Sequence, residues 1–93
     1  MTASDIDIRR RRLRFRAWHR GIREMDLLMG RFVDAELDGL SAADISGLEA
    51  LLDIPDPELF AWLTGQCPVP ADQDTPMFRR LKLFHDHDRP IHA

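Results

Sequence analysis

The sequence of 93 residues has a single cysteine, no tyrosine and no long apolar run. Cys67 has no second cysteine with which to form an intrachain disulfide, which indicates a reducing compartment. No segment approaches the roughly 20 apolar residues that cross a bilayer. No secretory signal follows Met1 either. We therefore expect a cytoplasmic protein that does not insert into a membrane.

The short motifs of catalysis and nucleotide binding are also missing. There is no glycine-rich phosphate loop, no G-x-S-x-G string and no H-E-x-x-H pair. Cys67 is followed by proline and has no base nearby in the sequence. Glu24 and Asp26 are two residues apart, so on a helix they do not converge as an acid–base pair. We therefore expect no enzymatic activity.

Charge is distributed unevenly along the chain, although the net charge is only −3. Residues 1–31 hold nine arginines and four acidic residues, which gives a local charge of +5. Residues 32–93 have a charge of −8. A small protein with this polarity is typical of oriented binding to a partner surface.

The hydrophobic pattern predicts helices, and no period-2 run of β-branched residues indicates a strand. Helices are expected over 4–18 and 22–37, then after caps at Ser41 and Asp56, and finally from 72–76 to about 86. The expected fold is all-α, a compact single-domain bundle of about five short helices over residues 1–93. Its core would span about 4–86, with a mobile tail at 87–93.

Local signals support these boundaries. Ser4 is a weak N-cap, Gly21 and Gly65 suit helix ends, and Ser41 with Asp44 forms a capping signal. The strongest apolar stripe lies on the second helix. The predicted core residues, in chain order, are Ile6, Leu13, Ala17, Met25, Leu28, Met29, Phe32, Val33, Leu37, Ile45, Leu48, Leu51, Leu52, Leu59, Phe60, Trp62, Leu63, Met77, Phe78, Leu81 and Phe84.

Six arginines between residues 9 and 16 form the densest charged cluster. They favour one alternative function, a nucleic-acid-binding or regulatory helical protein. On a helix, however, they spread around most of the circumference, and the rest of the chain is acidic. A solvated helix face, or a helix directed at an acidic protein partner, is the preferred interpretation, without nucleic acid.

A third interpretation concerns the end of the chain. His85, His87 and His92, with two aspartates, resemble a metal cluster in composition. On a helix, His85 and His87 point to different sides, and structural zinc needs four fixed ligands. We therefore expect no metal site there.

The most distinctive string runs from Trp18 to Asp26. Gly21 would let another backbone approach, and Arg20 would direct its guanidinium outward. Glu24, about one helical turn after Gly21, would place a carboxylate near Arg20. These features indicate a small platform that docks onto a loop of a partner protein.

The segment Arg20-Gly21-Ile22-Arg23-Glu24 resembles the R-G-x-x-E signature of the SdhE-like flavinylation and assembly factors of succinate dehydrogenase. Residues 51–53 and 56–63 are similar to the family's second signature, an acidic link that leads into a Leu-Phe-x-Trp-Leu helix, and Pro68 or Pro70 follows. The resemblance covers roughly residues 9–85. Two positions depart from it: Ile22 stands where methionine is usual, and His19 where many members have arginine.

This resemblance implies a five-helix fold and a partner, the flavoprotein subunit of succinate dehydrogenase and of fumarate reductase. The factor would help that subunit attach FAD covalently to one of its own histidines. FAD would belong to the partner, and this chain, a monomer, would bind no cofactor. The implied contact residues are Arg20, Gly21 and Glu24 with Ile22 and His19, while Arg23, Arg16 and the arginine-rich helix steer the approach. Trp62 is expected in the core.

Overall fold

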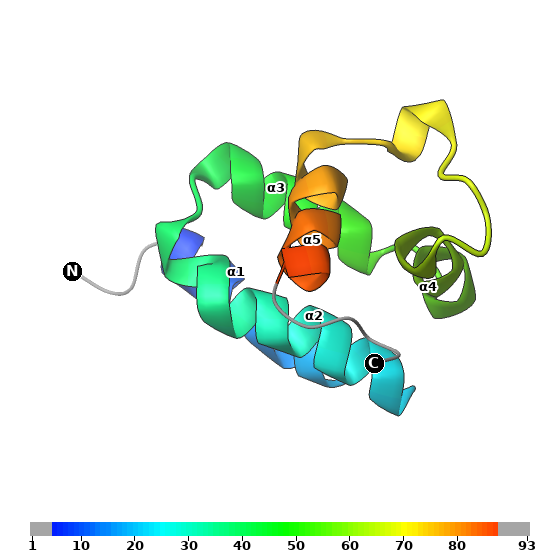
Figure 1. Ribbon diagram of the computed structural model, residues 1–93. Helices are drawn as coiled ribbons and strands as arrows, with labels where there is room; N and C mark the ends of the chain where they lie inside the picture. The colour runs from blue at the N-terminus through cyan, green and yellow to red at the C-terminus, as the bar shows by residue number, and fades with distance from the viewer. Residues whose placement is uncertain (1–4, 88–93) are drawn as a thin grey trace.

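Five α-helices and two single 3-10 turns make up the computed structural model, which describes residues 5–87 (Figure 1). The elements in chain order are α1 (Asp5–Trp18), α2 (Arg23–Glu36), η1 (Leu37–Gly39), α3 (Ala42–Leu52), α4 (Asp56–Thr64), η2 (Ala71–Gln73) and α5 (Pro76–His87). The described range contains no strand. The predicted all-α class with five helices is confirmed, while the Ser4 cap and the tail beyond residue 87 lie outside the described residues.

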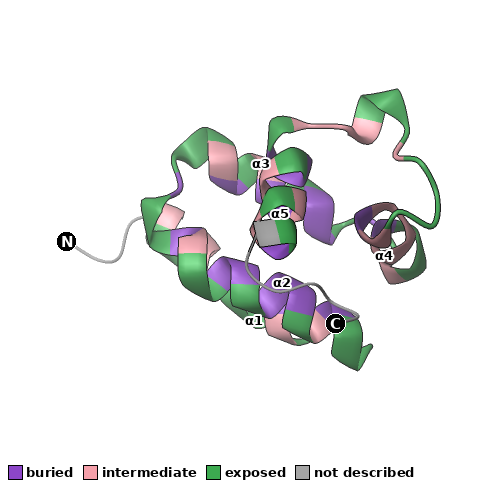
Figure 2. Ribbon diagram, in the orientation of Figure 1, coloured by how far each residue is buried: buried purple, intermediate pink, exposed green. Residues whose placement is uncertain are grey.

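The helices form two packed groups. α1 and α2 lie side by side as a hairpin, and α3 and α5 pack across them (Figure 1). α4 stands at one end, and a long connection leads from it through η2 back to α5. Buried residues face the space between these helices, and exposed residues face outward (Figure 2). No helix in the described range is both long and apolar enough to cross a membrane.

α2 supplies the centre of the core, as its periodicity predicted. Five of its side chains are buried, together with Gly30 and the side chain of Leu37 in η1. The rest of the core comes from every other helix, with Leu13 and Ala17 in α1 and Leu81 in α5. Phe60, Trp62, Phe84 and Ile6 are only partly buried, although they pack against this core. Burial of each large apolar side chain is worth about 1.5–3 kcal/mol, so this cluster is the main source of stability.

Helix ends follow the predicted signals with one exception. Ser41 and Asp44 form a complete capping box at the start of α3, and Gly65 ends α4 with a left-handed φ of 81°. Asp56, predicted as the N-cap of α4, is instead its first helical residue, and Pro55 holds the cap position. The reason is that the Asp56 carboxylate binds an arginine side chain and not the α4 backbone.

Much of the uneven charge is neutralised inside the fold. Arg9 of α1 binds Glu49 of α3 with an Nη2–Oε1 distance of 2.7 Å. Its guanidinium holds the pKa of Glu49 below the usual range through this hydrogen bond. Arg14 lies 3.6 Å from Asp34 of α2, and Arg10 donates to the Leu40 carbonyl. The basic first helix is therefore partly held by the acidic helices that follow it.

α1 and α2 approach closely where Trp18 covers Gly30. The indole Nε1 donates to the Asp34 carboxylate, 3.2 Å away, which fixes the ring over α2. A Cβ atom on Gly30 would overlap atoms of the indole ring. Gly30 is therefore required for the packing of the hairpin, in spite of the low helix propensity of glycine.

Replacing Gly30 by alanine is expected to destabilise the protein by about 1–3 kcal/mol, because overpacking exceeds the roughly 1 kcal/mol gain in helix propensity. In a Trp18→Ala background the same Gly30→Ala change should become stabilising, because the clash is gone. Urea denaturation followed by circular dichroism measures both effects. A stabilising Gly30→Ala change in the wild-type background would contradict the packing.

Candidate functional site

The link between α1 and α2, residues 19–22, contains most of the predicted contact residues. His19, Gly21, Ile22, Arg23 and Glu24 are all exposed, and together they are called the link surface. Gly21 has a φ of 104°, in the region that favours glycine. Nothing lies within 4 Å of the position its Cβ would occupy, so the surface above it is open. Three of these five residues lie in the link itself, and Arg23 and Glu24 begin α2.

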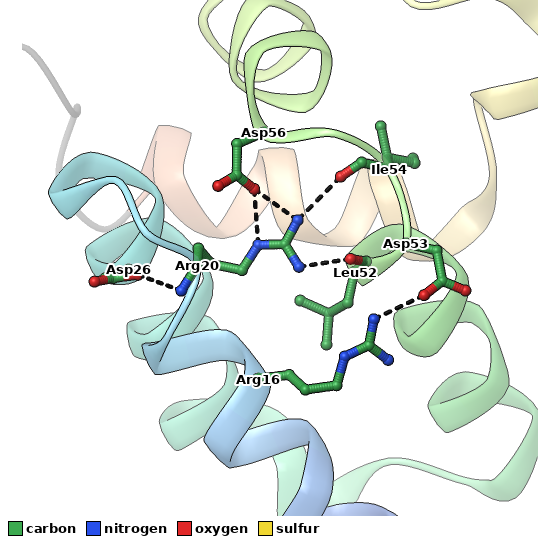
Figure 3. A network of polar contacts seen from close by, with 7 residues as sticks. All are labelled: Arg16, Arg20, Asp26, Leu52, Asp53, Ile54 and Asp56. Carbon is green, nitrogen blue, oxygen red and sulfur yellow. Dashed lines mark hydrogen bonds and ion pairs between the residues drawn. The ribbon is translucent and has the colours of Figure 1, made fainter.

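Arg20 does not point outward as predicted. Its side chain is only 10% exposed and extends toward the connection between α3 and α4 (Figure 3). The guanidinium binds Asp56 through Nε at 2.8 Å and Nη2 at 2.6 Å. It also donates to the backbone carbonyls of Leu52 and Ile54. The carboxylate beside Arg20 is thus that of Asp56 and not, as expected, that of Glu24.

These contacts explain why arginine is needed at this position. The carbonyl of Leu52, the last residue of α3, has no intrahelical donor and lies at the negative end of the helix dipole. The Ile54 carbonyl belongs to the connection that follows. A planar guanidinium offers several N–H groups in a fixed fork, so it can satisfy two carbonyls and one carboxylate together. Lysine offers a point charge without this geometry. Arg20 therefore joins the end of α3 to the start of α4.

The backbone of Arg20 adds a third connection. Its N–H donates to the Asp26 carboxylate in the first turn of α2, at 2.6 Å. Arg20 with Asp26, Leu52, Ile54 and Asp56 is called the Arg20 clamp (Figure 3). The clamp fixes the link against three helices while the side chains on either side of Arg20 remain exposed.

Arg16 is also held inside the molecule. It lies one turn before Arg20 and reaches Asp53 in the same α3–α4 connection, at 2.7 Å (Figure 3). Its side chain remains one-third exposed, so it supports the clamp from the solvent side. Arg23 and Glu24, in contrast, form no hydrogen bond or ion pair through their side chains with the residues that the structure describes. Their charges are available to a partner.

His19 makes contacts that the sequence did not predict. Its Nδ1 lies 2.7 Å from the Phe15 carbonyl, and its ring stacks on the Phe15 ring with centroids 4.0 Å apart. Phe15 is 64% exposed, and sequence analysis did not select it. The four-residue spacing between Phe15 in the last turn of α1 and His19 directly after the helix was the signal that could have identified the pair.

Metal ligands are not gathered in the described part of the chain. The side chains of residues 5–86 contain no group of three or more histidine, cysteine or acidic residues placed to hold a metal. His85 is buried, with Nε2 2.9 Å from the Leu28 carbonyl of α2, so it belongs to the helix packing. His92 lies outside the described residues.

An open depression of about 550 Å³ lies between α4 and α5. Its lining includes Trp62, Cys67 and Lys82, and no residue of the link surface. Trp62 therefore lines this depression and also packs against the hydrophobic core.

Loss of the clamp should destabilise the whole fold. Arg20→Ala would leave the Asp56 carboxylate, only 11% exposed, without its partner, and we expect a loss of about 3 kcal/mol. Arg20→Lys should recover only part of this loss, because it lacks the fork. Urea denaturation tests the series, with Arg23→Ala as an exposed control that leaves stability unchanged. Equal stability of Arg20→Ala and Arg23→Ala would refute the clamp.

The comparisons with known proteins agree with the motif. A family model described as "Flavinator of succinate dehydrogenase" matches residues 11–85, which include the link surface and the Arg20 clamp. The FAD assembly factor SdhE of Acetobacter pasteurianus is 51% identical over 77 residues, which are 83% of this chain and 71% of that protein.

Two mitochondrial relatives are more distant. Succinate dehydrogenase assembly factor 2 of Dictyostelium discoideum is 32% identical over 84 residues, and that of Debaryomyces hansenii is 40% identical over 86 residues. These alignments span 57% and 61% of the two relatives and about nine-tenths of this chain. With a family model over most of its length and a half-identical relative, this chain belongs to the family of succinate dehydrogenase flavinators, as its R-G-x-x-E segment predicted.

Proposed function

We propose that this chain is an FAD assembly factor that binds the flavoprotein subunit of succinate dehydrogenase and promotes its covalent flavinylation. Family membership and the half-identical relative, an FAD assembly factor, support this proposal. The observation that carries it is the link surface, an exposed turn held by the buried Arg20 clamp. Its two charges, those of Arg23 and Glu24, have no partner among the described residues. Fumarate reductase, whose flavoprotein subunit was implied by the resemblance, is included as a second partner.

The structure suggests two roles for the residues of the motif. Arg20 and Arg16 position the link and do not contact the partner, because their guanidinium groups are bound to the α3–α4 connection. Gly21, Arg23 and Glu24 contact the partner, with His19 and Ile22 beside them. A surface fixed before binding loses little conformational entropy when it docks. Adjacent opposite charges also select one orientation of the partner.

The chemistry of flavinylation belongs to the partner and its flavin in this proposal. This chain supplies orientation: it holds parts of the flavoprotein subunit so that the accepting histidine and the flavin meet in reactive geometry. It acts as a monomer, without catalytic residues and without a cofactor of its own. The cytoplasmic location expected from the sequence stays a prediction.

The nucleic-acid alternative is weakened by the arrangement of the arginine cluster. Four of its six members, Arg9, Arg10, Arg14 and Arg16, bind carboxylates or a carbonyl of the chain itself. A phosphate binder needs such groups free on one face, and it loses affinity steeply with salt. Protein binding is therefore the better interpretation of the basic helix.

Glu24→Ala should reduce covalent flavinylation at least about tenfold, because it removes an exposed charge that contacts the partner. The readout is the flavin fluorescence of the flavoprotein subunit on a denaturing gel. Cells that lack this gene would be complemented with the wild type or with a variant. Stability should not change, since Glu24 has no partner among the described side chains.

Glu58→Ala is the matched control for this experiment, because Glu58 is an exposed glutamate in the first turn of α4, as Glu24 is in α2. It should restore the fluorescent band fully. A band of equal strength in cells without the gene would reject the assembly role. A normal band with Glu24→Ala alone would reject this residue as a contact.

A further inference from the structure

α1 has a second face that the fold does not use. Ile8 and Phe15 lie within about 20° of one another around the helix, at about 100° per residue. His19 directly follows the end of α1, with its ring stacked on that of Phe15. Ile8 and Phe15 point away from Leu13 and Ala17, which are buried against the other helices. Ile8 is 43% exposed and Phe15 64% exposed. These three residues are called the Phe15 stripe.

The arginines of α1 divide according to their distance from this stripe. Arg9 and Arg16 lie roughly 100–120° from Phe15 on the side of α3, and Arg14 lies about 100° away on the side of α2. Arg9 binds Glu49 of α3, Arg14 lies 3.6 Å from Asp34 of α2, and Arg16 binds Asp53 directly after α3. The arginines that fold α1 onto its neighbours are therefore the ones farthest from the stripe.

Arg11 and Arg12 flank the stripe on either side and are exposed. Neither forms a hydrogen bond or an ion pair with any residue from 5 to 87. Arg12 affects Glu49 only through longer-range charge, in the direction of a lower Glu49 pKa. Two cations thus stand beside an exposed aromatic ring, without a direct ion pair to any described residue.

The Phe15 ring is held in place before any partner arrives. The His19 ring stacks on it at an interplanar angle of 15°, and the His19 Nδ1 is bound to the Phe15 carbonyl at 2.7 Å. A fixed exposed aromatic group is the usual form of an interface anchor, because little side-chain entropy is lost on burial. His19 also belongs to the link surface, so the stripe and the link surface are continuous.

We propose that the Phe15 stripe, with Arg11 and Arg12, is a second docking surface for the flavoprotein subunit of succinate dehydrogenase. It fits an apolar pocket with acidic residues at its rim. The proposal rests on the proposed function and extends its contact area from the link along α1. Phe15 is the anchor, and the two arginines accelerate association with the acidic rim.

Charge favours this occupant over two others. A symmetric dimer through the stripe would place Arg11 and Arg12 of one copy close to those of the other, and like charges repel. Nucleic acid would meet only two unpaired arginines on this face of a chain whose net charge is −3. An apolar pocket with an acidic rim on a protein surface would bury the aromatic ring and pair with both cations.

Phe15→Ala should weaken binding of the full chain to the purified flavoprotein subunit about tenfold, mainly through faster dissociation. Surface-plasmon-resonance kinetics measure this change. Leu83→Ala is the matched control, because Leu83 of α5 is also a large exposed apolar residue, at 55%. It should change the affinity less than twofold. Both variants should keep the wild-type melting temperature, because neither side chain is buried.

The double variant Arg11→Gln/Arg12→Gln should lower the association rate severalfold and flatten its salt dependence. Phe15→Ala should keep the wild-type salt dependence. An unchanged association rate in the double variant overturns the role of the two arginines.

The remaining outcomes separate the two proposals. If the wild-type chain does not bind the flavoprotein subunit, the proposed function fails. If the wild type binds, Glu24→Ala weakens binding and Phe15→Ala equals Leu83→Ala, only the second docking surface is rejected. Sedimentation that shows a dimer lost in Phe15→Ala, or binding to a short DNA duplex lost in Arg11→Gln/Arg12→Gln, would also overturn it.

Discussion

The contacts of the Arg20 guanidinium hold the functional end of this molecule together. The side chain binds the carbonyl of Leu52 at the end of α3, that of Ile54 in the following connection and the Asp56 carboxylate of α4. The backbone N–H of Arg20 binds Asp26 of α2. The link between α1 and α2 has no regular structure and almost no buried side chains. Without the clamp, nothing comparable would fix its direction. The exposed residues of the link therefore depend on one that is almost completely hidden.

This arrangement separates two functions within one short motif. In R-G-x-x-E, the arginine side chain is buried and binds other parts of the protein. The glycine allows a positive backbone φ, and the glutamate is exposed to solvent. Loss of activity on replacing Arg20 would not by itself identify a contact, since the same change removes the support of the link. Stability and binding have to be measured together for residues of this kind. The unpaired Arg23 and Glu24 are simpler probes of recognition.

The same division applies to α1 as a whole. Its arginines looked like one basic cluster in the sequence, yet three of the six bind acidic residues of α2, α3 and the α3–α4 connection. The opposite charges of the two parts of the chain are thus largely a means of folding. What is left for a partner is a narrow face with Phe15, Arg11 and Arg12, next to the link surface. This face and the link together suit an acidic protein surface with an apolar pocket.

The sequence alone determined the helices, most of the core and the family. The 3.6-residue period of α2 marks its buried face, the capping box marks the start of α3, and Gly21 and Gly65 mark turns with positive φ. It also identified the exposed link residues. Only the tertiary structure decided where Arg20 points, why Asp56 is not a cap, and which arginines stay free. Helical spacing gives the direction of a side chain around the axis of its own helix. Whether that angle meets a carbonyl, a carboxylate or water depends on helices that are distant in the sequence, and Asp56 lies 36 residues from Arg20.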